Sequence, residues 1–85
     1  AVTVNNLALV LKDQYRFAEA ARLLELGISH SPDVAELHFN LAVIAELYLL
    51  DLQTALEHYN RYRQLTDKED QRVAGWIADL ERRLQ

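Results

Sequence analysis

The sequence contains neither cysteine nor methionine, and its 85 residues include one proline and two glycines. Without cysteine the chain offers no disulfide, no thiolate ligand for zinc and no thiol nucleophile, and its compartment stays open. The scarcity of glycine and proline favours helices over a sandwich or barrel of strands. Because residue 1 is not methionine, we interpret the chain as a piece of a longer protein, so a missing targeting segment carries little meaning.

The sequence also lacks a long apolar run and an excess of positive charge. No stretch is long enough to span a bilayer, so membrane insertion is not expected. Nine lysines and arginines against thirteen aspartates and glutamates give a net charge of −4, which argues against nucleic acid or an anionic membrane surface as the partner. Apolar residues make up 51% of the chain, which predicts one small globular domain.

Two successive helical faces begin the chain. The first repeats at i, i+3, i+4 and i+7 and consists of Val4, Leu7, Ala8 and Leu11. The second consists of Phe17, Ala20, Leu24, Gly27 and Ile28. Residues 13–16 lack this periodicity and predict the turn between two antiparallel helices. Ala8, Ala20 and Gly27 are small enough to let helix axes approach closely, and glycine inside a helix costs about 1 kcal/mol relative to alanine. Gly27 therefore predicts another helix lying directly against it.

The end of the first helical pair is marked by Pro32, which cannot donate a backbone hydrogen bond and disfavours a helical residue before it. Residues 33–36 then have the pattern of a capping box, in which Asp33 accepts a backbone N–H and Glu36 reaches back. Residues 66–69 form a second candidate capping box.

The same pattern returns about 34 residues later. The places of the first helical face are taken by His38, Leu41, Ala42 and Ala45. Ala55 and Tyr59 take the places of Ala20 and Leu24, one residue late, which predicts a one-residue insertion in the turn at residues 48–51.

The last segment predicts one helix with a single apolar face, which consists of Val73, Trp76, Ile77, Leu80 and Leu84. Such a helix can cover the open end of a stack of repeats. Because all connections are short, we expect an all-α fold of five antiparallel helices, organised as a first repeat at 1–34, a second at 35–69 and a capping helix at 70–85.

These spaced residues resemble the tetratricopeptide repeat, whose signature is W-x2-L-G-x2-Y, then A-x3-F, then P. The first copy supplies Val4-x2-Leu7-Ala8-x2-Leu11, Ala20-x3-Leu24 and Pro32. The second supplies His38-x2-Leu41-Ala42-x2-Ala45 and Ala55-x3-Tyr59. The chain departs from the pattern at Val4 and His38, where tryptophan is usual, at Ala45, where a large residue is usual, and in the missing second proline. The resemblance covers nearly the whole chain, and the last helix is similar to the solvating helix that ends many such arrays.

The resemblance implies a right-handed superhelix whose concave groove holds partner peptides. The groove residues that it implies are Asn5, Leu9, Lys12, Glu36, Phe39, Val43, Glu46 and Leu47, with Val2, Asp13, Ala74 and Ala78 beside them. One family variant grips the C-terminal carboxylate of chaperone tails at the positions of Asn5, Leu9, Asn40, Gln71 and Gly75. Only Asn40 agrees with that variant, and the cations that a carboxylate needs are missing, so we do not expect this ligand.

The resemblance predicts a protein-interaction module that binds a peptide or partner segment, as part of a larger scaffold or assembly protein. Leu9, Phe39 and Val43, with Leu47, would form an apolar strip for an apolar or amphipathic peptide, or else pack against neighbouring helices. Residues 47–52 are unusually apolar for a turn; they form either a partner contact or, as we favour, part of the packed interior. The alternative function is a structural end of a longer array that supports neighbouring repeats or self-associates into a homo-oligomer.

We expect no active site, metal or cofactor. His30, His38 and His58 lack the spacing of a helical zinc pair, so we expect His38 to be a satisfied core histidine and His58 to lie at the surface. Residues 59–63 mix aromatic and cationic side chains, but Tyr59 and Tyr62 should face inward, which argues against RNA binding. Residues 55–59 and 76–80 are similar to bacterial members of the family, which favours a bacterial cytoplasmic or periplasmic protein.

Overall fold

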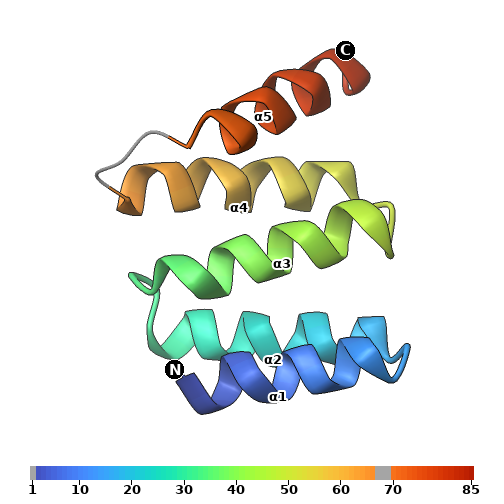
Figure 1. The fold of residues 1–85 in the computed structure, drawn as a ribbon, viewed down its shortest axis with the longest axis vertical. Coiled ribbons are helices and arrows are strands. Elements are labelled where there is room, and N and C mark those ends of the chain that lie inside the picture. The colour runs from blue at the N-terminus through green and yellow to red at the C-terminus, as the bar shows by residue number, and fades with distance from the viewer. Residues whose placement is uncertain (1, 67–69) are drawn as a thin grey trace.

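The computed structural model describes residues 2–66 and 70–85, which form five α-helices. The helices are α1 at Val2–Asp13, α2 at Phe17–His30, α3 at Ala35–Leu47, α4 at Leu52–Leu65 and α5 at Gln71–Arg83. Each packs on the next one along the chain, and α1 also contacts α3. Figure 1 shows α1 and α2 at one end of the long axis and α5 at the other. The described residues contain no strand, so the expected all-α fold of five helices is confirmed.

Two buried clusters form the core, and α3 contributes to both. The first cluster joins α1, α2 and α3 and consists of Ala8, Ala20, Ala21, Leu24, Leu37, Leu41 and Ile44. The second joins α3, α4 and α5 and consists of Ala42, Ala45, Ala55, Tyr59, Val73, Ile77 and Leu80. A helix that is apolar on two sides must be covered on both sides. This explains why α3 lies in the middle of the stack.

Small residues lie at contacts between the helices. Ala8 and Ala20 are fully buried, and Gly27 is buried where α2 meets both α1 and α3. A Cβ atom at Gly27 would come within 2.9 Å of Val4 Cγ1 and 3.4 Å of Leu37 Cδ1. The close approach that the sequence predicts at Gly27 is therefore confirmed, and Ala8 and Ala20 lie in the buried core.

The outer faces of the first and last helices differ from the predicted pattern. Leu7 is 49% exposed, although its spacing placed it on the buried face, because α2 and α3 cover the side of α1 that carries Ala8. On α5, Trp76 is 37% exposed at the margin of the buried face, and Leu84, just after the helix, is 40% exposed. The apolar stripes of the sequence are thus wider than the surfaces that the neighbouring helices cover.

The turn between α1 and α2 and the turn between α3 and α4 lie at the same end of the molecule, at the right in Figure 1. Three residues, 14–16, separate α1 from α2, and four residues, 48–51, separate α3 from α4, so the second of these turns is one residue longer than the first. The turns contain Tyr15 with φ 63° and Leu50 with φ 54°. This left-handed region of the backbone is disfavoured for residues other than glycine, asparagine and aspartate.

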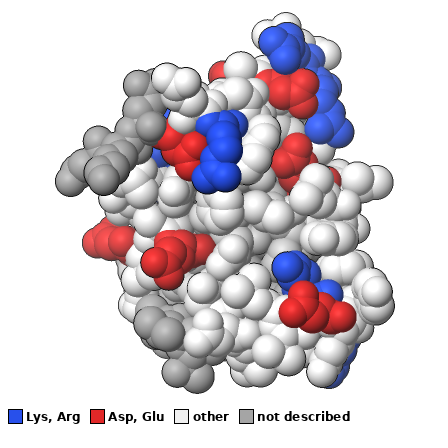
Figure 2. Space-filling view, viewed as in Figure 1, with Lys and Arg blue, Asp and Glu red and all other residues white. Residues whose placement is uncertain are grey.

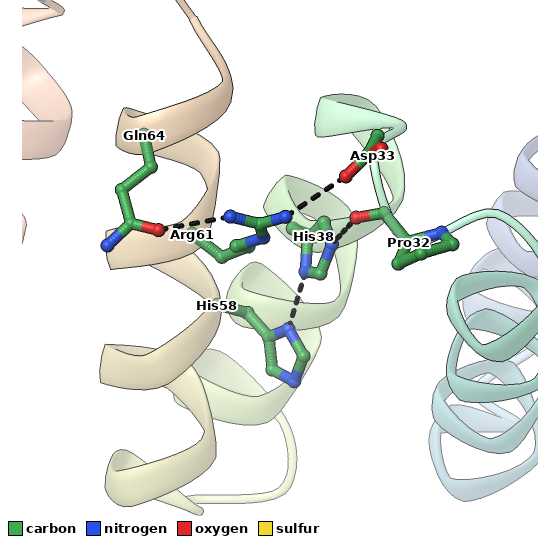
Figure 3. Close-up of polar contacts among 6 residues, drawn as sticks. All are labelled: Pro32, Asp33, His38, His58, Arg61 and Gln64. Carbon is green, nitrogen blue, oxygen red and sulfur yellow. Dashed lines mark hydrogen bonds and ion pairs between the residues drawn. The ribbon is translucent and has the colours of Figure 1, made fainter.

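The capping box predicted at residues 33–36 is wrong. Val34 is the N-cap of α3 and gives no side-chain cap, whereas the Asp33 carboxylate accepts a hydrogen bond from Arg61 Nη2 of α4 at 3.0 Å (Figure 3). Asp33 therefore forms an ion pair with Arg61 of α4 and does not cap the start of α3. Asp51 is a true cap, because its side chain accepts the Thr54 N–H at 3.2 Å. Of the second candidate box, residues 67–69 lie outside the described part of the chain.

Candidate functional site

The eight residues implied to line a groove lie on α1 and α3. Those that are half-buried are Asn5, Leu9, Lys12, Phe39, Val43 and Glu46, and those that are exposed are Glu36 and Leu47. Asn40 of α3 donates a hydrogen bond from Nδ2 to Oδ1 of Asn5 of α1, so these sides of the two helices adjoin. The role of this surface as a groove stays a prediction.

Phe39 is surrounded by aromatic rings from α4 and α5. Its ring centroid lies 6.1 Å from that of Tyr59, 5.1 Å from that of Tyr62 and 6.3 Å from that of Trp76. Phe39 and Val43 also pack against the second core cluster, so for these two residues the contact with neighbouring helices is real. Phe39 nevertheless keeps part of its surface open, and Trp76 is 37% exposed. The two rings form an aromatic surface between α3 and α5.

A second link between α3 and α5 is charged. Glu46 accepts a hydrogen bond from the Tyr59 hydroxyl at 3.0 Å and lies 3.7 Å from Arg83 Nη1. Burial, and next the Glu46 carboxylate, raise the pKa of Tyr59 well above its ordinary value. The phenol therefore stays protonated and continues to donate to Glu46, which fixes the carboxylate beside Arg83.

These contacts join the odd-numbered helices along one side of the molecule. We call this surface the odd-helix face; its residues are Asn5, Leu9, Lys12, Glu36, Phe39, Val43, Glu46, Leu47, Trp76 and Arg83. On α5 the residues that meet α3 are Trp76 and Arg83, whereas Ala74 and Ala78 lie on another side of that helix. Sequence reasoning missed Trp76 as a surface residue because it falls on the apolar stripe; its position at the edge of that stripe was the available signal.

A histidine pair connects α3 to α4. His38 is buried, and its Nε2 lies 2.7 Å from the Pro32 carbonyl oxygen, to which it must donate (Figure 3). Its Nδ1 lies 2.8 Å from Nδ1 of His58. In the neutral pair His38 Nδ1 has no hydrogen, so His58 donates to it. The predicted satisfied core histidine is confirmed at His38.

The prediction that His58 lies at the surface is wrong, because it is half-buried against His38. Burial, and next the neighbouring His38 ring, lower the pKa of His58, although Glu57 acts in the opposite direction. Two histidine nitrogens that bind one zinc ion lie about 3.3 Å apart, since each Zn–N bond is about 2 Å long and the two bonds meet at a roughly tetrahedral angle. The 2.8 Å separation of the two Nδ1 atoms is that of a hydrogen bond.

The turn between α3 and α4 is not part of the interior, which corrects the favoured interpretation of residues 47–52. Exposed fractions are 60% for Leu47, 45% for Tyr48, 40% for Leu49 and 73% for Leu50. The Asp51 N–H donates to the Ala45 carbonyl at 2.8 Å, which closes the turn. Leu52 alone in this segment packs against the second core cluster.

A shallow pocket of about 400 Å³ lies beside this turn. Its lining consists of Tyr15, Arg16, Phe17, Ala18, Glu19, Arg22 and Leu49. Figure 2 shows lysine, arginine, aspartate and glutamate side chains in a few separate groups, with uncharged side chains over most of the face in view.

No model of a known protein family matches the sequence, and a search of curated proteins gives no significant match. Within residues 2–66 and 70–85, none of the helices combines the length and the apolar character that crossing a bilayer requires.

Proposed function

We propose that the chain is a tetratricopeptide-like repeat module whose odd-helix face binds a segment of a partner protein. In this proposal the repeats at 1–34 and 35–69 and the capping helix at 70–85 stack as a right-handed superhelix. Three features support it: the two spaced copies in the sequence, the close helix approach at Gly27, and the pairwise packing of successive helices.

The observation that carries the binding proposal is the aromatic surface between α3 and α5. Phe39 and Trp76 come from different helices, keep part of their rings exposed, and rest on Tyr59, which is 1% exposed. Partly exposed aromatic side chains on a rigid base are typical anchors of protein interfaces, because they bury much apolar area at little entropic cost. A partner side chain would cover the open parts of both rings.

The chemistry of the partner follows from the rest of the face. Leu9 and Val43 offer half-buried apolar surface and Leu47 offers exposed apolar surface, whereas Lys12 and Glu36 carry opposite charges. We therefore expect a peptide with apolar anchor residues flanked by charges of both signs, bound as an extended segment or as an amphipathic helix. We propose no catalytic role for this face, and we expect neither nucleic acid nor the carboxylate of a chaperone tail as the ligand.

The test is selection of binders from a random peptide library displayed on phage, followed by affinity measurement on variants. Leu47→Asp and Trp76→Gln should each weaken the selected peptide by about tenfold or more, which corresponds to about 1.4 kcal/mol. The matched control is Leu26→Asp on α2, because Leu26 is 56% exposed and Leu47 is 60% exposed. Equal losses at Leu26 and Leu47, or no loss at Leu47 and Trp76, would reject the odd-helix face as the binding site.

One observation favours the alternative of a structural end segment in a longer array. Leu7 and Val10 are each 49% exposed on the outer side of α1, where a further helical hairpin could pack. Leu7→Gln with Val10→Gln should leave the selected peptide bound. If the double variant no longer binds the selected peptide or any other partner segment, the structural alternative is favoured over the binding proposal.

A further inference from the structure

The turn end of the molecule carries a continuous apolar surface, which we call the turn patch and which consists of Tyr15, Phe17, Tyr48, Leu49 and Leu50. The rings of Phe17 and Tyr48 stack with centroids 4.1 Å apart and planes 8° apart, and Tyr15 meets Phe17 edge-on at 6.1 Å. Leu49 shares the wall of the shallow pocket with Tyr15 and Phe17. The turns of the two helical hairpins are thus joined into one surface.

Two residues of this patch combine high exposure with an unfavourable backbone conformation. Tyr15 is 83% exposed with φ 63°, and Leu50 is 73% exposed with φ 54°. A left-handed conformation is disfavoured for both side chains, and neither side chain recovers this loss through burial. Strained backbone that displays an apolar side chain is a reason to look for a binding role. Large exposed apolar patches on small domains usually mark an interface.

The pocket in the patch has basic character, although the whole chain carries a net charge of −4. Its charged residues are Arg16, Glu19 and Arg22. Arg16 donates from Nε to Glu19 Oε1 at 3.0 Å, and this hydrogen bond lowers the pKa of Glu19. Arg22 makes no ion pair within the part of the chain that the structure describes. The pocket therefore suits an apolar side chain that is followed closely by a carboxylate.

The turn patch itself carries such a group. Leu50 is the most exposed leucine of the α3–α4 turn, and the next residue is Asp51, whose carboxylate is also exposed. A pocket and a matching projection on one surface meet the requirement of an isologous interface, in which the same patch serves both copies. Homodimer interfaces are also more apolar than other interfaces, as this patch is.

We propose that a second copy of this chain covers the turn patch in a twofold dimer. Leu50 of each copy enters the shallow pocket of the other, and Asp51 of each copy faces Arg22 of the other. The interface is small, so the dimer is weak and forms between micromolar and millimolar protein. This inference is independent of the odd-helix face, which lies on other residues of the helices.

Sedimentation velocity of the full chain over that concentration range tests the proposal. The average mass should rise from 9.8 kDa towards twice that value. Leu50→Gly should weaken the dimer by about tenfold or more, while the thermal midpoint of the dilute monomer stays the same or rises, because glycine accepts a positive φ. Leu26→Gln, on an equally apolar exposed position outside the patch, should leave the dimer intact. A protein that stays monomeric throughout the range would overturn the proposal.

A double-mutant cycle tests the contact between Arg22 and Asp51. Asp51→Asn keeps the helix cap, since asparagine caps as well as aspartate, but removes the charge. Asp51→Asn and Arg22→Gln should each weaken the dimer, and the second change should add little to the first. Additive effects would disprove this pairing. A monomer whose patch amide signals shift with the probe acetyl-Leu-Asp-amide would assign the patch to a foreign segment and also overturn the dimer.

Discussion

The Nδ1 atoms of His38 and His58 lie 2.8 Å apart and share one hydrogen. His38 uses its other nitrogen to donate to the Pro32 carbonyl at 2.7 Å, so His58 must donate in the neutral pair. The pair thereby connects α4 to α3 and to the connection that precedes α3 (Figure 3). If both rings were protonated, two N–H groups would face each other and the bond would be lost.

Folding stability should therefore fall as the pH falls. The folded-state pKa of His58 is lowered by burial and by His38, so the unfolded chain binds more protons below the ordinary histidine pKa of about 6.5. The stabilisation from neutral His58 is present above that pH and is lost as the pH falls through the folded-state pKa. Urea unfolding across the range from about pH 7.5 to about pH 5 measures this slope.

Two variants separate the contribution of His58 to the pH dependence of stability from the contributions of other titratable groups. His58→Asn keeps an N–H donor for His38 but cannot titrate, so the slope should become shallower. The control variant is His30→Asn, at an exposed histidine outside this pair. Equal slopes in the wild type and His58→Asn would show that His58 is not the titrating group.

Gly27 and Gly75 should respond in opposite directions to alanine. A Cβ at Gly27 would lie 2.9 Å from Val4 Cγ1, so Gly27→Ala should lower the free energy of unfolding by about 1 kcal/mol despite the better helix propensity of alanine. Gly75 is exposed in α5 with nothing within 4 Å of its Cβ position, and Gly75→Ala should raise stability by about 1 kcal/mol. Thermal unfolding measures both, and adding Val4→Ala to Gly27→Ala tests the clash.

Asp51 should matter more than Asp33 for stability. Asp51 caps α4 by accepting from Thr54, so Asp51→Ala should cost about 1 kcal/mol in denaturant unfolding. The Asp33 side chain is 80% exposed and pairs only with Arg61 among the described residues, so Asp33→Ala should cost less than about 0.5 kcal/mol. Equal costs would mean that Asp33 also caps a helix in solution.

The Tyr59 hydroxyl should contribute to stability through Glu46. Tyr59→Phe leaves the largely buried carboxylate without this donor and should lower the free energy of unfolding by about 1–2 kcal/mol. Tyr62 is half-buried nearby, and its hydroxyl makes no hydrogen bond within residues 2–66 and 70–85. Tyr62→Phe is therefore the matched control and should change stability little. The two variants are compared by urea unfolding at neutral pH.

The helices and most of the core could be predicted because they depend on local spacing. Apolar periodicity placed Leu24, Leu41 and Tyr59 inside, where they are at most 1% exposed. Gly27 indicated a close helix contact, because a glycine inside a helix is otherwise unfavourable. The one-residue difference between the two turns followed from the offset between the two copies.

The remaining features depend on pairings between elements, which spacing does not reveal. Nothing in the sequence shows that His58 of α4 forms a hydrogen bond with His38 of α3. Nor does it show that Asp33 pairs with Arg61 of α4 and leaves the start of α3 uncapped. Leu50 is exposed and adopts a positive φ that a leucine rarely adopts, which the spacing does not indicate. Trp76 was placed on the correct stripe, but how far α4 covers that stripe is a property of tertiary packing.

Backbone and indole NMR signals, recorded while a library-selected peptide is added to isotope-labelled protein, test the binding proposal most directly. We expect the largest shifts at Leu9, Val43 and the Trp76 indole, with little change at Leu26 on α2. The largest shifts at Leu26 and other exposed positions of α2 and α4, with Trp76 unchanged, would contradict the assignment of the odd-helix face as the peptide-binding surface.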